Sequence, residues 1–297
     1  TTAKHISELL YKIIQSELNN YKHMKTVKKG SDLSITVNNL SLSYRDVGVG
    51  SVPIIFLHGF PFDKTMWQPQ LDCFKTSHRL ISFDLRGFGK SNDEQSSLSI
   101  NGFVDDLIQF MDVLNIDTAI LCGLSMGGYI ALQAMKRFPK RFKALILCDT
   151  QCIADTQEGR EKRYKAMAAF EVDGVKNFNE GFVKNIFHKD SIAHKQKLVE
   201  QVRKVVFSNS KQILTQGMLA LAERSETCAT LKEISVPTLI ICGREDIVTP
   251  LAQSESMQTS ITGSILRVID DAGHVSNLEQ PEVFNKYLQD FLTTLEL

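Results

Sequence analysis

The sequence lacks features that would place it in several other classes of protein. It has no net charge, because its 34 lysines and arginines are matched by 34 aspartates and glutamates. A balanced chain has no long-range field to attract nucleic acid or an anionic membrane, so neither is predicted as a partner. It also has no apolar run long enough to span a membrane. The 297 residues, 43% of them hydrophobic, are instead expected to bury one large core.

Cysteine pairs with redox or metal-binding spacing are missing as well. The six cysteines are scattered, none in a Cys-x-x-Cys pair, and no nearby histidine completes a zinc set with Cys148 and Cys152. Three of the six, Cys122, Cys148 and Cys242, lie in apolar, strand-like segments, where cysteine acts as a small buried side chain. This usage is typical of a reducing compartment, so a cytoplasmic location is predicted.

The N-terminal segment, residues 1–30, stands apart from the rest. Its apolar residues recur at helical spacing and form one face: Ile6, Leu9, Leu10, Ile13, Ile14 and Leu18. Polar residues interrupt the run, unlike the apolar stretch of a secretory signal. We expect an amphipathic helix that packs on its own domain or on the partner in a homodimer. Because lysines follow this segment, a helix lying on a membrane surface is the alternative.

Segments of strand type and helix type alternate along most of the chain. Residues 34–37 and 40–44 alternate apolar with polar side chains, which is typical of a half-exposed antiparallel hairpin. Six near-continuous apolar runs follow, with helical segments between several of them: 52–57, 80–83, 118–122, 144–148, 238–242 and 264–269. Such runs suit strands covered on both faces. The pattern therefore predicts an α/β fold with a mostly parallel central sheet and helices on both faces.

One stretch breaks this alternation. Between residues 151 and 225 there is no good buried strand, and helix-type segments rich in Lys, Glu, Met and Phe take its place. We expect a helical cap insertion at 151–225, with the core formed by residues 31–150 and 226–297. Insertions at the carboxyl ends of parallel strands are where such folds form their pockets.

The strongest chemical signal is the run LCGLSMGG at residues 121–128, with Ser125 between Gly123 and Gly127. An apolar strand-like run precedes it, and a helical run closed by Pro139 follows. Glycines at these positions permit a sharp turn in which the serine adopts a strained conformation. A serine hydroxyl becomes a useful nucleophile once a base removes its proton and the backbone presents it. The context predicts a nucleophile elbow.

A serine nucleophile needs a histidine as base and an acid that orients the histidine. His274 is the best placed of the seven histidines, since it follows the last strand and precedes a helix expected over 282–291. Asp246 follows the strand at 238–242 and is the predicted acid; Asp149, at the end of an earlier strand, is the alternative. Ser125, Asp246 and His274 follow the chain order of an α/β-hydrolase triad.

The developing oxyanion needs backbone N–H donors. The amide of Met126, directly after the nucleophile, is one candidate, and the amide of Phe60 in the loop at 58–61 is the other. Phe60, Phe62, Trp67 and Met126 either line an apolar acyl pocket or belong to the ordinary core.

Two other features receive structural roles. His58 is expected to hold its loop by hydrogen bonds rather than to act as a second base. The loop at 84–91 contains a Gly-x-Gly pattern, which alone is weak evidence for phosphate binding, so a tight structural loop is predicted.

From about residue 42 to its end, the chain resembles the α/β-hydrolases. The resemblance rests on five motifs: LHGFP at 57–61, DLRGFGKS at 84–91, GLSMGG at 123–128, GRED at 243–246 and AGH at 272–274. Within the superfamily it is similar to oxoadipate enol-lactonases, cofactor-free haloperoxidase-type perhydrolases and small carboxylesterases. Haloalkane dehalogenases and epoxide hydrolases carry aspartate at the position of Ser125, so serine there implies acyl chemistry.

The resemblance implies a serine hydrolase that acts on a small carboxylic ester or lactone through an acyl-enzyme, with no cofactor and no metal. Carbon–carbon bond hydrolysis or perhydrolysis by the same residues is an alternative, and a non-catalytic small-molecule receptor is another. An enol-lactonase would need a cation for the substrate carboxylate. The cap offers five candidates: Arg160, Lys162, Arg163, Lys165 and Lys184.

Overall fold

A computed structural model describes residues 29–91 and 97–295 of the chain. The amphipathic helix predicted for the N-terminal segment, and the dimer contact expected from it, fall outside the described residues. Within those residues, no helix is both long enough and apolar enough to cross a membrane.

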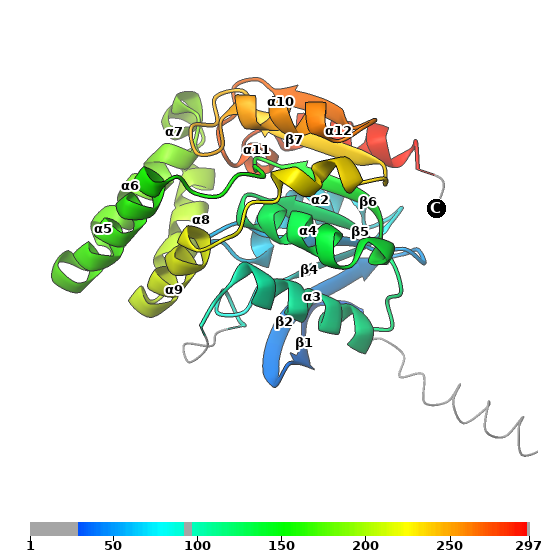
Figure 1. Cartoon of the computed structure of the whole chain (residues 1–297), viewed down its shortest axis with the longest axis horizontal. Helices are drawn as coiled ribbons and strands as arrows, with labels where there is room; N and C mark the ends of the chain where they lie inside the picture. The colour runs from blue at the N-terminus through cyan, green and yellow to red at the C-terminus, as the bar shows by residue number, and fades with distance from the viewer. Residues whose placement is uncertain (1–28, 92–96, 296–297) are drawn as a thin grey trace, which may run out of the picture.

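An eight-stranded sheet forms the centre of the molecule (Figure 1). Its strands lie in the order β1-β2-β4-β3-β5-β6-β7-β8; β2 pairs antiparallel with β1 and β4, and the other neighbours are parallel. The predictions of an N-terminal hairpin and a mostly parallel sheet are confirmed. The strands are β1 (Gly30–Val37), β2 (Leu40–Gly48), β3 (Ile54–Leu57), β4 (Arg79–Phe83), β5 (Ala119–Leu124), β6 (Phe142–Cys148), β7 (Thr238–Gly243) and β8 (Ile265–Ile269).

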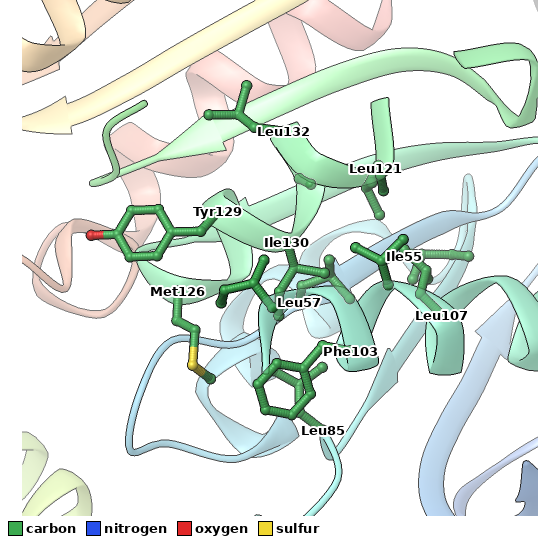
Figure 2. Packing of buried hydrophobic residues seen from close by; sticks show 14 of the residues in the cluster. Ile55, Leu57, Leu85, Phe103, Leu107, Leu121, Met126, Tyr129, Ile130 and Leu132 are labelled. Carbon is green, nitrogen blue, oxygen red and sulfur yellow. The ribbon is translucent and has the colours of Figure 1, made fainter. Parts of the chain in front are cut away.

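Helices cover both faces of this sheet, which explains the continuous apolar strands. Successive side chains of a strand point to opposite faces. In β3, Ile55 and Leu57 pack with α3 (Ile100–Val113), α4 (Met126–Arg137) and α10 (Leu251–Ser260). Figure 2 shows Ile55 and Leu57 beside Phe103 and Leu107 of α3 and Ile130 of α4.

The opposite face holds a second core. Ile54 and Phe56 of β3 pack there with α2 (Gln68–Phe74) and α12 (Pro281–Leu292). A strand covered on both sides has no polar face, so its sequence shows no alternation. Shorter elements complete this part of the fold: the 3₁₀ helices η1 (Lys64–Trp67), η2 (Pro139–Arg141) and η3 (Cys228–Glu233), and the short helix α11 (Ser276–Glu279).

The last strand differs from the others. Residues 264–269 read as a doubly covered strand, but β8 lies at the edge of the sheet and most of its residues are partly exposed. Arg267 in its middle is exposed. An edge strand needs less cover, and a charged side chain on it discourages pairing with other chains.

Five helices are inserted between β6 and β7, where the helical cap is predicted (Figure 1). Among them, α5 packs against α9 and α6 against α8. No strand lies among the described residues of this stretch. The helices are α5 (Gln157–Asp173), α6 (Lys176–Ile186), α7 (Lys189–His194), α8 (Gln196–Phe207) and α9 (Lys211–Ala222).

A disulfide joins the two ends of the insertion. Cys152, ahead of α5, is bonded to Cys228 at the start of η3, 76 residues later. The Thr227 N–H donates to the Cys152 carbonyl at 2.9 Å, so the two connecting segments run side by side. The sequence analysis interpreted the scattered cysteines as typical of a reducing compartment and did not identify this disulfide. The disulfide was missed because the pairing depends on the fold returning the chain to the point where the insertion begins.

Candidate active site

Ser125 occupies the tight turn between β5 and α4. Its backbone has φ 54° and ψ −115°, a conformation that few residues other than glycine adopt. Strain of this kind persists only where the surroundings enforce it, and it is common at active sites. The Ser125 N–H donates to the Cys148 carbonyl at 3.0 Å, and the Ser125 carbonyl accepts from the Gly128 and Tyr129 amides. The turn is thus held from both sides.

The glycines of the motif are required by close backbone contacts. A Cβ on Gly123 would lie 2.2 Å from the Gly127 carbonyl oxygen, and one on Gly127 would lie 2.2 Å from the Leu57 carbonyl oxygen. Real Cβ atoms do not approach backbone oxygens so closely. The start of α4 therefore packs directly on the end of β3 because residue 127 has no side chain.

We predict that Gly127→Ala destabilises the protein by about 3 kcal/mol, because the added methyl must push the backbone of β3 away from α4. The melting temperature should fall by roughly 6–12 °C. The matched control is Gly181→Ala in α6, where an added Cβ has no neighbour within 4 Å. Helix propensity favours alanine there, so its melting temperature should stay level or rise slightly. Equal melting temperatures for the two variants would contradict this account of the elbow.

Three side chains that lie far apart in the sequence meet at this turn. The His274 Nε2 atom lies 2.8 Å from Ser125 Oγ, and its Nδ1 atom lies 2.8 Å from Asp246 Oδ2. His274 comes from the loop after β8, and Asp246 from the loop after β7. All three are buried, with exposed fractions of 8% for Ser125, 4% for Asp246 and 1% for His274. The structure therefore brings together the serine, histidine and acid that the sequence singles out.

Hydrogen bonds hold Asp246 as an anion. Its Oδ1 atom accepts from the amides of Val248 at 2.8 Å and Thr249 at 3.0 Å, and its Oδ2 atom accepts from the Thr249 hydroxyl at 2.7 Å. Burial alone would raise the pKa of Asp246, but the adjoining His274 and the amide and hydroxyl of Thr249 lower it below its usual value. A charged carboxylate next to Nδ1 fixes that nitrogen as the N–H donor and leaves Nε2 free to accept a proton.

Asp149, the alternative acid, is buried nearby but has other partners. Its Oδ1 atom accepts from the Gly243 amide at 2.8 Å, and its Oδ2 atom from the Ser276 hydroxyl at 2.6 Å. Burial, together with the negative charge of Asp246, raises the pKa of Asp149 well above its usual value. Asp149 thus joins the ends of β6 and β7 to the start of α11, while Asp246 contacts His274.

The loop after β3 lies against the serine. A Cβ on Gly59 would be 3.1 Å from Ser125 Cβ, so Gly59 packs directly on the serine. Phe60 is the next residue along this loop. Met126 is the first residue of α4, where N–H groups have no acceptor within the helix. The His58 ring holds the loop: its Nε2 atom accepts from the Leu85 amide, and its Nδ1 atom lies 2.9 Å from the Gly59 carbonyl. The structural role predicted for His58 matches these contacts.

The two aromatic residues predicted for the pocket lie in different surroundings. Phe62 is 5.9 Å from the ring of Phe182 in α6, measured between centroids, and lines a cavity of about 440 Å³ between η1 and α8. Trp67 has no exposed surface and packs against Phe56 and Phe284. The structure therefore places Trp67 in the core and not at a pocket.

The cap cations do not form one cluster of free charges. Arg163 pairs with Asp155, and Lys162 pairs with Glu158 on the same helix. Arg160, Lys165 and Lys184 are exposed. Arg45 and Lys204, which the sequence analysis did not single out, line the cavity beside Phe62, and Arg45 donates a hydrogen bond to Gln68 there.

Glu279 is a buried acid that the sequence analysis missed. It accepts from the Gly273 amide at 2.6 Å and from the His188 amide at 2.8 Å, so it joins the loop that carries His274 to the start of α7. Burial raises the pKa of Glu279 above its usual value. The sequence signal was weak, because an acid in a short polar segment before Pro281 is typical of an ordinary helix start.

The chain belongs to the family with the α/β-hydrolase fold, whose sequence profile matches residues 52–281. The predictions of this fold and of a hydrolytic enzyme are confirmed. The chain is 30% identical to 3-oxoadipate enol-lactonase 1 of Acinetobacter baylyi over 274 residues, which cover 92% of this chain and 97% of the relative.

Two solved structures extend the likeness. An esterase from Thermogutta terrifontis superposes with a TM-score of 0.84 at 30% identity, covering 89% of this chain and 99% of the esterase. An enol-lactonase from Burkholderia xenovorans superposes with a TM-score of 0.82 at 26% identity, covering 88% of this chain and all of the other, 100%.

Proposed function

We propose that this protein hydrolyses small carboxylic esters or lactones with Ser125 as nucleophile, His274 as base and Asp246 as the orienting acid. The observation that carries the proposal is the unbroken line of contacts from Ser125 Oγ through His274 to Asp246, with 2.8 Å at each step. The strained turn at Ser125 supports it, because an elbow holds the hydroxyl toward an incoming carbonyl.

In the first half of the reaction, Ser125 Oγ attacks the substrate carbonyl and passes its proton to His274 Nε2. Asp246 stabilises the imidazolium that forms. His274 then protonates the leaving oxygen, which leaves an acyl group on Ser125. In the second half, His274 activates a water molecule that attacks the acyl carbonyl, and the serine is regenerated.

The negative charge that develops on the substrate oxygen is held by backbone donors in this proposal. The Phe60 and Met126 amides are the candidates, because Phe60 follows Gly59, which packs on Ser125, and Met126 follows Ser125 directly as the first residue of α4. Donors that are oriented beforehand cost no rearrangement during the reaction.

The pocket role of Phe62 stays a proposal. Phe62 lines a cavity of about 440 Å³ with residues of η1 and α8, and neither Ser125 nor His274 lines that cavity. The relatives named as enol-lactonases and as an esterase support both substrate classes.

The proposed reaction on a small-molecule substrate uses no cofactor. The predicted cytoplasmic location stays a prediction, and the Cys152–Cys228 disulfide argues against it, since stable disulfides are rare in reducing compartments.

Labelling with a fluorophosphonate probe tests whether Ser125 is activated. We expect one probe per chain, located on the peptide that contains Ser125 by mass spectrometry, and no label after His274→Ala. A panel of p-nitrophenyl esters, lactones, β-diketones and a peracid-forming assay then separates ester and lactone hydrolysis from carbon–carbon cleavage and perhydrolysis. An unlabelled native protein would overturn the proposed nucleophile.

The pH dependence of kcat/KM follows from the surroundings of His274. Burial alone would lower its pKa, but Asp246 and the other nearby acids raise the pKa above the ordinary 6.5. A raised pKa keeps the imidazole protonated to higher pH, whereas the base must be neutral to act. We therefore expect kcat/KM to fall as the pH drops through a midpoint above 6.5. A rate profile with its acid midpoint below that value would contradict the assigned base.

A further inference from the structure

A second cavity, of about 490 Å³, lies at the junction of α7 with the loops after β7 and β8. It is separate from the cavity beside Phe62, and its walls come from different segments. Figure 1 shows α7 beside the orange loops near α11. The Glu279 side chain connects these segments, because it accepts from both the Gly273 and His188 amides.

Three potential metal ligands gather in this cavity. His188 precedes α7, Asp190 lies in its first turn, and Asp271 lies in the loop after β8. One ligand atom from each, an imidazole nitrogen and two carboxylate oxygens, lies within 4.8 Å of the others. In a tetrahedral zinc site, nitrogen and oxygen ligand atoms lie about 3.4 Å from one another. The two aspartates are exposed, so a small movement of their side chains closes the set.

The state of His188 is the independent observation that points to a ligand. The residue is only 8% exposed, and its Nδ1 atom is buried without a hydrogen-bond partner. The nearest carboxylate oxygen of Asp190 is 3.9 Å away, too far for a hydrogen bond. A buried polar nitrogen without a partner is costly, and an ion between His188 and the two carboxylates would remove that cost.

The charge of the cavity suits a divalent cation. Asp190, Asp271 and Glu245 contribute three carboxylates to its walls, while Lys189 contributes one ammonium. These charged side chains sum to a net negative charge. An imidazole in the set favours zinc over magnesium or calcium, which prefer oxygen ligands alone.

We propose that His188, Asp190 and Asp271 form a zinc site that links the helical insertion to the loop carrying His274. The ion would not take part in the proposed hydrolysis, because its ligands are distinct from Ser125, Asp246 and His274. It would instead fasten α7 to a segment that begins three residues before His274.

Calorimetric titration of the full chain with ZnCl₂, without an affinity tag, tests the site. We expect one zinc per chain at this site, with affinity lowered at least tenfold in Asp190→Asn and in Asp271→Asn. Zinc should also raise the melting temperature of the native chain and not that of Asp271→Asn. Both aspartates are exposed, so these variants should fold normally. Magnesium and calcium should not compete at equal concentration.

Matched controls and a direct view decide the outcome. His194→Gln, at the exposed end of α7, and Asp270→Asn, beside Asp271, should bind zinc like the native chain. Crystals soaked in zinc should give an anomalous peak between His188, Asp190 and Asp271. Zinc binding that is unchanged in Asp271→Asn, or a peak only at other histidines, overturns the proposal, as does the absence of binding. The test is independent of hydrolysis, since Ser125→Ala should bind zinc normally.

Discussion

Ser125→Ala is expected to lower kcat/KM for p-nitrophenyl butyrate by roughly 10⁴-fold or more, because the covalent route through the acyl-enzyme is lost. The remaining activity would come from binding and from the oxyanion donors alone. The substitution removes one oxygen atom from a residue that is 8% exposed, so the fold should be kept. Initial rates at several substrate concentrations, together with a melting curve for each protein, measure both effects.

Ser256→Ala is the matched control for the nucleophile. Ser256 is an exposed residue of α10 and has no part in the proposed chemistry. It should hydrolyse the ester at the native rate. If Ser125→Ala keeps its activity within about tenfold of the native protein, the acyl-enzyme route is wrong.

The parallel core could be predicted from the sequence because its signals are local. A strand covered on both faces must be largely apolar. Strands β3, β5 and β7 are buried along their whole length, and β6 is buried except at Lys143 near its start. The elbow was predictable for the same reason, since Gly123, Ser125 and Gly127 lie within five residues of one another. Histidine and acid could be selected because both follow strands, and the carboxyl ends of parallel strands meet at one edge of the sheet.

Contacts between residues that lie far apart in the sequence could not be predicted in this way. The Cys152–Cys228 bond forms because the insertion begins and ends at the same place. Glu279 accepts hydrogen bonds from the amides of Gly273 and His188, which only the tertiary fold brings together. Trp67 was assigned to either pocket or core because an aromatic residue after the β3 loop has the same sequence signal in both roles. Its neighbours Phe56 and Phe284 decide for the core.

Asp246→Asn is expected to lower kcat by about 10⁴-fold while leaving the fold intact, because an amide can donate to His274 Nδ1 and thereby select the wrong tautomer. The Nε2 atom would then carry the proton and could not accept one from Ser125. Loss of the negative charge should also lower the pKa of His274, since Asp246 is one of the groups that raise it. Stopped-flow acylation rates across a range of pH report both effects.

The same substitution at Asp149 separates the two candidate acids. Burial and the negative charge of Asp246 raise the pKa of Asp149 well above its usual value, so the site disfavours a charged carboxylate and should accept an uncharged amide of the same shape. In Asp149→Asn the side-chain oxygen still accepts from the Gly243 amide, and the NH₂ group can donate to the Ser276 hydroxyl. Its kcat should stay within about tenfold of the native value. The reverse result, a loss at Asp149 and none at Asp246, would assign the acid to the end of β6, because His274 would then depend on the carboxyl that it does not contact here.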